Sequence, residues 1–265
     1  MKKSGRTVII IICAVVAVCC AAYLVYHFVS KAADNNKNQE LESRVSAQTS
    51  ETTPATASGT DAATVTVSDE ETSEYVSPID FTELKAINPE AYAWITMENT
   101  DMSYPIVQHA DLSNRDYYLT RDLEGNYLES GTIYTIPPTA LDFSDNVTII
   151  YGHNKSKFEA LRNFRDKSYW EDHSTFTIYT EETAYTYRVF SAKVFSNVYI
   201  PSYIDLYDDA QRQDLIDSLL EVSQFNDCVD ETVKVTAEDK IAILSTCVNN
   251  DNSRRYLISG VLVED

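Results

Sequence analysis

The chain has 265 residues, of which 44% are hydrophobic, and a formal net charge of −20 from 21 Lys and Arg against 41 Asp and Glu. This excess of acid argues against nucleic-acid binding, which requires clustered basic side chains. It argues equally against peripheral attachment to anionic lipid. The length suits one or two globular domains, so the elements along the chain decide how much of it folds.

The N-terminal region has the pattern of a membrane anchor. Residues 8–29 read VIIIICAVVAVCCAAYLVYHFV, with no Asp, Glu, Lys or Arg, and about 20 apolar residues are enough for a helix to cross a bilayer. Lys2, Lys3 and Arg6 precede this run, and basic flanks stay cytoplasmic, so the rest of the chain is expected outside the cell. A cleaved signal peptide is the alternative, but its apolar core normally spans about 7–15 residues. We expect a cytoplasmic basic tail at 1–7 and an uncleaved, single-pass transmembrane anchor at 8–30.

A polar segment follows the anchor. Residues 31–77 are rich in Ser, Thr, Ala, Asn and Glu and contain few large apolar side chains. Such a segment cannot bury enough apolar surface to offset its ordering entropy. We therefore expect a flexible stalk over 31–77 that holds the following domain away from the membrane.

The chain from 78 to 265 has the pattern of one mainly β domain. Eight runs rich in Tyr, Val, Ile, Thr and Phe favour pleated, half-buried strands. These strands are expected at 94–97, 103–108, 131–136, 146–151, 175–180, 184–195, 241–246 and 255–263. Eight strands with few helices predict a closed eight-stranded β-barrel.

Four helices are expected around these strands. Two short ones, at 81–86 and 89–93, precede the first strand, the second with Pro at a tolerated first-turn position. A third, at 157–164, has three apolar residues at helical spacing. The longest runs from Asp208 to about Phe225, between the sixth and seventh strands. Its apolar stripe consists of Leu215, Ile216, Leu219, Leu220 and Val222.

The five cysteines do not form a disulfide framework. Three of them, Cys13, Cys19 and Cys20, lie in the apolar run, where they behave as small hydrophobes. Only Cys228 and Cys247 remain for the folded domain, and a single bridge between them is possible in an oxidising compartment. No His, Cys and carboxylate cluster has the spacing of metal ligands, so we expect neither a metal nor another cofactor.

Three residues suited to acyl transfer stand where strands meet loops. Cys247 ends a strand in Leu-Ser-Thr-Cys, His153 follows a strand in Tyr-Gly-His-Asn, and Arg255 opens the last strand. Acyl transfer through a thiol needs a nucleophile, a proton donor for the leaving amine and donors for the oxyanion, which Cys, His and Arg can supply. From the residues alone, the ordinary roles stay open: a buried small Cys, a turn His and a solvated Arg. Arg254 competes with Arg255, and only one of two successive strand residues can face a site.

The domain resembles class B sortases, the cysteine transpeptidases of Gram-positive surfaces, from about Asn88 to Val263. The similar segments, in chain order, are Asn-Pro-Glu-Ala-Tyr-Ala-Trp-Ile at 88–95, Tyr-Pro-Ile-Val-Gln at 104–108, Tyr-Tyr-Leu at 117–119, Gly-Thr-Ile-Tyr at 131–134, Tyr-Gly-His-Asn at 151–154, Leu-Ser-Thr-Cys at 244–247 and Arg-Tyr-Leu-Ile-Ser-Gly at 255–260. The expected helix at 208–225 resembles the class B insertion. The segment after His153 is shorter here than is usual in the class.

The resemblance implies a function and a set of site residues. Cys247 attacks the Thr carbonyl of a C-terminal sorting signal on a surface protein, with His153 and Arg255 completing the catalytic set. A thioacyl enzyme forms and is resolved by an amine of a peptidoglycan precursor or cross-bridge. The resemblance also implies that Tyr151, Ser245 and Leu119 line the groove for the substrate peptide.

Other functions remain open at this point. A thiol peptidase that releases its acyl group to water has the same residue chemistry. A non-catalytic, membrane-tethered binding or assembly protein is the alternative from another class, against which the complete Cys, His and Arg set argues. A pilin-polymerising sortase is disfavoured, because no Asp-Pro pair of the kind found in the lid of those enzymes occurs in the chain.

Overall fold

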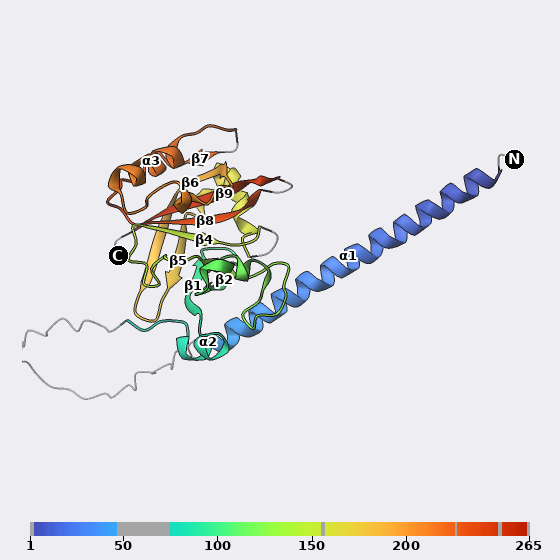
Figure 1. Cartoon of the computed structure of the whole chain (residues 1–265), viewed down its shortest axis with the longest axis horizontal. Coiled ribbons are helices and arrows are strands. Elements are labelled where there is room, and N and C mark those ends of the chain that lie inside the picture. The colour runs from blue at the N-terminus through green and yellow to red at the C-terminus, as the bar shows by residue number, and fades with distance from the viewer. Residues whose placement is uncertain (1–2, 47–74, 155–156, 226, 249–250, 264–265) are drawn as a thin grey trace, which may run out of the picture. The chain divides into compact units, whose positions relative to one another are not determined.

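The computed structural model describes residues 3–46, 75–154, 157–225, 227–248 and 251–263 (Figure 1). Within it the chain divides into two compact units, residues 1–44 and 45–265, which are considered separately below. The first unit is helical and the second carries the β structure.

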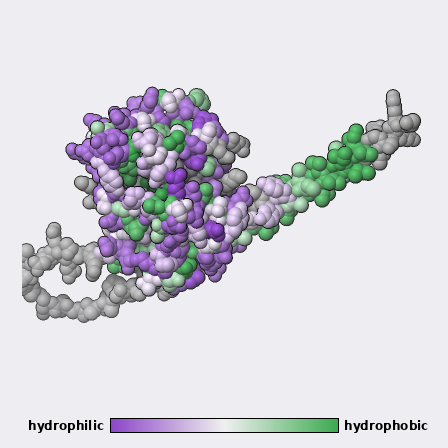
Figure 2. Space-filling model, viewed as in Figure 1, coloured by the Kyte–Doolittle hydropathy of each residue, from purple (hydrophilic) through white to green (hydrophobic). Residues whose placement is uncertain are grey.

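The first unit is formed by helix α1, Lys3–Val45. The apolar residues of its 8–29 stretch are exposed, and α1 is the one helix among the described residues that is long and apolar enough to cross a membrane. Figure 2 shows this stretch as a continuous hydrophobic surface. The helix continues through 31–45, the first part of the expected stalk, because Ala, Lys, Gln, Glu and Leu in this stretch favour helix. Residues 47–74 of the expected stalk lie outside the described residues.

The second unit contains a closed β-barrel, as predicted. The sheet order is β5-β1-β2-β3-β4-β8-β9-β6-β7, and pairing between β5 and β6 closes eight of these strands into a ring (Figure 1). The two-residue β7 pairs with β6 alone, at Ser191 and Ala192, beyond the β5–β6 pairing. The strands are β1 Ala91–Met97, β2 Ser103–Gln108, β3 Ile133–Thr135, β4 Val147–Tyr151, β5 Thr175–Tyr179, β6 Ala184–Ser196, β7 Cys228–Val229, β8 Ile241–Val248 and β9 Asp251–Leu262.

The helices of this unit lie around the barrel. Asp80 caps the N-terminus of α2, and Asp208 caps that of α3, by accepting backbone N–H groups. The α-helices are α2 Phe81–Ile87 and α3 Asp209–Leu220. Short 3₁₀ turns occupy the connections: η1 Leu112–Asn114, η2 Tyr117–Thr120, η3 Ala160–Arg165, η4 Lys167–Glu171 and η5 Ile200–Ser202.

Two of the predicted helices are wrong. The helix expected at 89–93 does not form, because the Asn88 side chain accepts the backbone N–H of Glu90 at 2.8 Å and turns the chain into β1. The helix expected at 157–164 is a turn followed by η3. Its three apolar residues are nevertheless all buried, so the spacing identified the core positions but not the helix type.

The long helix is shorter than predicted. It ends at Leu220, and the backbone N–H groups of Ser223 and Gln224 bind the carboxylate of Asp227. Val222, expected on the apolar stripe, is therefore 61% exposed, whereas Leu215, Ile216 and Leu219 are buried.

The core has two parts, one inside the barrel and one under α3. Successive residues of β4 alternate between them: Ile150 packs inside the barrel, whereas Val147 and Ile149 pack outside it with α3. The covered outer face holds β4, β8 and β9 rigidly, which matters because these strands carry the site residues.

Candidate active site

A cavity of about 180 Å³ opens at the carboxyl ends of β4 and β8. The two strands are parallel neighbours, with Tyr151 opposite Ser245, so their carboxyl ends meet at the same edge of the barrel. All six site residues predicted from the sequence line this cavity, which we call the Cys247 cavity: Leu119, Tyr151, His153, Ser245, Cys247 and Arg255. The fold therefore brings together residues that are up to 136 positions apart in the chain.

Cys247 and Arg255 are direct cross-strand partners. They lie opposite each other in the antiparallel pairing of β8 and β9, so their side chains leave the sheet on the same face. The expectation that Arg255 opens the last strand is wrong, because β9 already begins at Asp251. The register of β8 and β9 shifts just after Cys247, and such an irregularity re-aims side chains at a sheet edge.

The neighbouring Arg254 is engaged elsewhere. Its guanidinium donates to Asp251 at 2.5 Å and to the Gln224 side chain at 3.3 Å, and it does not line the Cys247 cavity. The alternation of strand side chains thus decides which of the two arginines faces Cys247.

His153 is held beside β8 by bonds from the residues on either side of it. The hydroxyl of Thr246 donates to the Gly152 carbonyl at 2.7 Å, and the Asn154 amide donates to the Cys247 carbonyl at 2.5 Å. The backbone N–H of Gly152 also donates to Ser245 at 3.1 Å. These bonds continue the β4–β8 pairing past its last regular pair, so the position of the His153 backbone relative to Cys247 is fixed on both sides.

Gly152 is needed for this arrangement on steric grounds. A Cβ at this position would lie 2.8 Å from the ring of Phe158, a distance that real Cβ atoms do not tolerate. Phe158 is fully buried, and its backbone N–H donates to the His153 carbonyl at 2.9 Å. The ring of Phe158 therefore supports the turn that carries His153.

Sequence reasoning missed Thr246 and Asn154. Both are almost completely buried, with exposures of 1% and 4%. Each directly adjoins a predicted catalytic residue and carries a short polar side chain, which is the signal that could have identified them as supports of the site.

Two stacked tyrosines of the Cys247 cavity, Tyr134 and Tyr151, keep their phenol protons near neutral pH. Burial raises the pKa of Tyr134 and Tyr151 well above the ordinary value, the negative charge of Asp116 raises both further, and Arg255 lowers both by less. The two rings stack with their centres 5.5 Å apart, and the Tyr134 hydroxyl donates to Asp116 at 3.2 Å. Neither tyrosine can act as a base near neutral pH.

The other cysteine takes no part in this site. All five cysteines, each within the described residues, have free thiols, so the possible bridge between Cys228 and Cys247 is not formed. The Cys228 thiol faces the carbonyl of Arg165 at 3.6 Å, and burial raises its pKa. Over the part of the chain that the structure describes, no group of three or more His, Cys, Asp and Glu could hold a metal ion.

Comparison with known proteins gives a consistent family. Residues 95–263 match the family model of the sortase domain. Sortase B of Listeria monocytogenes is 32% identical over 186 residues, which cover 68% of this chain and 73% of that protein. Among solved structures, the Staphylococcus aureus sortase B–substrate complex is 25% identical with a TM-score of 0.61, over 72% of this chain and 87% of that one. Sortase B from Bacillus anthracis in complex with AAEK1 is 29% identical with a TM-score of 0.59, over 71% and 86% of the two chains.

Proposed function

This chain belongs to the sortase family as a class B, sortase-type cysteine transpeptidase, and on that premise we propose which residues perform the reaction, on which substrates and at which side of the membrane. The proposed catalytic residues are Cys247, His153 and Arg255. The proposed substrates are surface proteins with a C-terminal sorting signal and an amine of a peptidoglycan precursor or cross-bridge. One observation carries the proposal: Cys247 and Arg255 are cross-strand partners that line the same cavity as His153.

In the first half-reaction, the thiolate of Cys247 attacks the carbonyl carbon of the residue before the cleaved bond, which by family resemblance is a threonine. The C–S bond forms and negative charge develops on the carbonyl oxygen, which the Arg255 guanidinium stabilises by hydrogen bonding. The C–N bond then breaks as imidazolium His153 gives its proton to the leaving amine. The products are a thioester on Cys247, a neutral His153 and the free downstream peptide.

In the second half-reaction, the acceptor amine attacks the thioester. Neutral His153 takes the proton from the amine as the new C–N bond forms, and the C–S bond breaks to regenerate the Cys247 thiolate. The overall exchange of one amide for another leaves the enzyme in its starting protonation state. By resemblance, Tyr151, Ser245 and Leu119 hold the acyl part of the peptide in the Cys247 cavity throughout.

The proposed location is the outer face of the cell membrane, with the N-terminus in the cytoplasm. Support comes from the length and apolar composition of α1 and from the basic residues before its apolar stretch. The proposed domains are the basic tail at 1–7, the anchor at 8–30, the stalk at 31–77 and the catalytic domain at 78–265. Protease treatment of intact cells should digest the catalytic domain and spare the tail. Protection of the catalytic domain would show that the chain crosses the membrane in the opposite direction.

The assignment of Arg255 can be tested against its neighbour. The full chain, inserted in lipid nanodiscs, is incubated with a pool of fluorogenic sorting-signal peptides and an amine acceptor, and products are identified by mass spectrometry. Arg255→Ala should lower kcat/KM by about 100-fold, the magnitude typical of losing an oxyanion donor. Arg254→Ala is the matched control and should retain activity, because its side chain is bound to Asp251 outside the cavity. If kcat/KM falls equally in both variants, Arg255 has no specific role in the mechanism. If the acyl group is released only to water, the protein is a peptidase and not a transpeptidase.

A further inference from the structure

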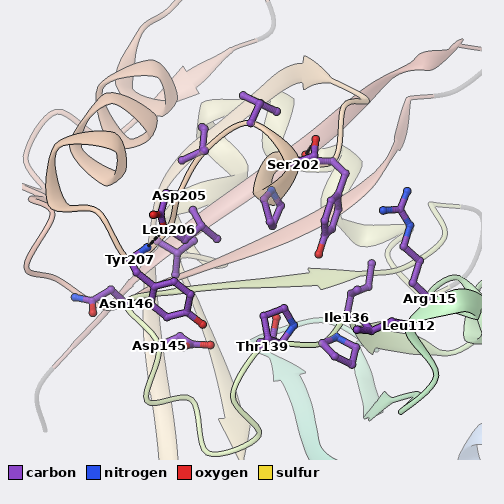
Figure 3. Close-up of a pocket in the computed structure, with 17 residues that line it drawn as sticks. Leu112, Arg115, Ile136, Thr139, Asp145, Asn146, Ser202, Asp205, Leu206 and Tyr207 are labelled. Atoms are coloured by element: carbon purple, nitrogen blue, oxygen red, sulfur yellow. Dashed lines mark hydrogen bonds between the residues drawn. The ribbon is translucent and has the colours of Figure 1, made fainter.

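A second cavity, of about 630 Å³, adjoins the Cys247 cavity (Figure 3). We call it the tyrosine-lined cavity, because Tyr199, Tyr203 and Tyr207 form part of its wall. Its size is in the range of sites that hold small ligands or several peptide residues. The two cavities share Arg115, Ile136 and Tyr199 in their linings, so they adjoin each other, and we call the pair the hollow.

The direction of this hollow follows from β4. Its carboxyl end reaches Tyr151 and then His153 in the Cys247 cavity, whereas its amino end at Val147 lines the tyrosine-lined cavity. From Val147 to Tyr151 a strand rises about 13 Å, the length of about four extended residues. The tyrosine-lined cavity therefore lies within reach of a peptide bound at Cys247.

The chemistry decides which part of a substrate reaches that end. His153 protonates the leaving amine and deprotonates the incoming one, so both amines occupy the His153 end of the hollow. The tyrosine-lined cavity lies toward the opposite end of β4, where the acyl part of the substrate must extend. It is thus placed for residues that precede the cleaved bond.

Charge is distributed unevenly in the tyrosine-lined cavity. Arg115 lies at one end and Asp145 and Asp205 at the other, as Figure 3 shows. Each of the two carboxylates already accepts a backbone N–H, from Ala140 at 2.7 Å and from Tyr207 at 3.0 Å.

Arg115 is the cation at the junction of the two cavities. Its guanidinium carbon lies 4.7 Å from the centre of the Tyr199 ring, which holds the group in place by a cation–π contact. Among the described residues it forms no ion pair, so its hydrogen-bond donors are available to a ligand. A guanidinium held over an aromatic ring is suited to bidentate binding of a carboxylate.

We propose that Arg115 determines sequence specificity by binding the carboxylate of an Asp or Glu at one of the four residues that precede the threonine before the cleaved bond. This inference rests on the proposed transpeptidase function and deepens it, since it adds a preferred charge to the acyl-donor substrate. A carboxylate on the acceptor amine is the other source of the same chemistry, and the test separates the two.

The test uses the full chain in nanodiscs and a set of peptides with Thr before the cleaved bond. Each of the four residues preceding that Thr is set in turn to Asp, Asn or Lys, and the rate of Cys247 acylation is measured by mass spectrometry. At one position, Asp should be preferred over the isosteric Asn by about tenfold, the scale of one charge-assisted hydrogen bond. Arg115→Ala should abolish this preference, and Arg115→Glu should reverse it in favour of Lys.

Arg121→Ala is the matched control. Arg121 also stacks on a tyrosine, Tyr117, at 4.8 Å and comes from the same connection between β2 and β3, but it lines neither cavity. Its loss should leave the preference for Asp unchanged. Because Arg115 is exposed, its substitution should not prevent folding.

The possible failures are distinguishable. If no peptide acylates Cys247 in any variant, the proposed function fails and this inference with it. If peptides acylate Cys247 without a preference for Asp, or if the preference survives in Arg115→Ala, the function stands and the inference is overturned. If Arg115 instead affects only the transfer to carboxylate-bearing amines over plain amines, its assignment to the acyl donor is wrong.

Discussion

The bond between Asn154 and the Cys247 carbonyl leads to the most specific prediction about the site. In Asn154→Ala the half-buried Cys247 carbonyl loses the donor that the buried Asn154 amide supplies, and an unmade hydrogen bond of this kind costs about 1–3 kcal/mol of unfolding free energy. The variant also loses the bond that holds the backbone on the C-terminal side of His153, so that only the Thr246–Gly152 bond and the Gly152 N–H bond hold it on the other side. A displacement of about 1 Å in a catalytic group can lower the rate by about 100-fold, so we expect kcat to fall by about 10- to 100-fold with little change in KM.

Asn88→Ala is the matched control for this prediction. The Asn88 amide is also buried, at 6% exposure, and also donates to a backbone carbonyl, that of Leu123, at 2.8 Å. Because Asn88 does not line the Cys247 cavity, its loss should leave kcat unchanged, and it should lower stability by at least as much, since the Glu90 N–H loses its acceptor as well.

The assay combines urea unfolding with two readouts of the site. One is kcat on the peptide pool, and the other is the rate at which iodoacetamide alkylates Cys247, followed peptide by peptide so that Cys228 is resolved. If Asn154→Ala loses stability but retains kcat and the alkylation rate, the bond supports only the fold. If it loses neither stability nor activity, the bond has no energetic role and the reasoning is refuted.

Three further predictions concern the supports of the site. Thr246→Val should lower the unfolding free energy by about 1–3 kcal/mol in urea, because the Gly152 carbonyl loses its donor; an unchanged midpoint would contradict this. Gly152→Ala should cost about 1–3 kcal/mol by overpacking against Phe158, and a fully stable variant would show that the ring can move. Burial alone would raise the pKa of Glu90, but hydrogen bonds from Tyr118, from His109 and from the backbone N–H of Ala110 together lower it from 4.5. The stability that Glu90 contributes is therefore present above the unfolded pKa of 4.5 and is lost as the pH falls through the lower pKa of the folded protein. Glu90→Gln should accordingly flatten the acid side of a plot of stability against pH, and an equally steep acid side would refute this linkage.

The barrel, and the residues that line the Cys247 cavity, could be located from the sequence because their signals are local. Runs of β-branched and aromatic residues specify strands by their alternation, and Cys247 and His153 each sit beside such a run. What the sequence pattern does not contain is the pairing of strands distant in the chain. The parallel contact of β4 with β8, which brings His153 to Cys247, joins segments about 90 residues apart and depends on the whole barrel closing.

Two of the errors, at 89–93 and at the end of α3, have a common physical origin in side chains that bind the backbone. Pro89 to Ala93 has helical propensity, yet the Asn88 side chain captures the Glu90 N–H and directs the chain into a strand. The carboxylate of Asp227 similarly occupies backbone donors beyond α3, so the helix stops at Leu220. Propensity is a weak prior at such points, because one well-placed polar side chain outweighs it.

The central claim is that Cys247 is the nucleophile of an acyl transfer. The most direct measurement is the intact mass of the full chain in nanodiscs after a brief incubation with the peptide pool, before an amine acceptor is added. We expect an acyl adduct on Cys247 that hydroxylamine removes, as a thioester requires, and that is absent in Cys247→Ala. An adduct on another residue, or cleavage of the peptides by Cys247→Ala, would contradict it.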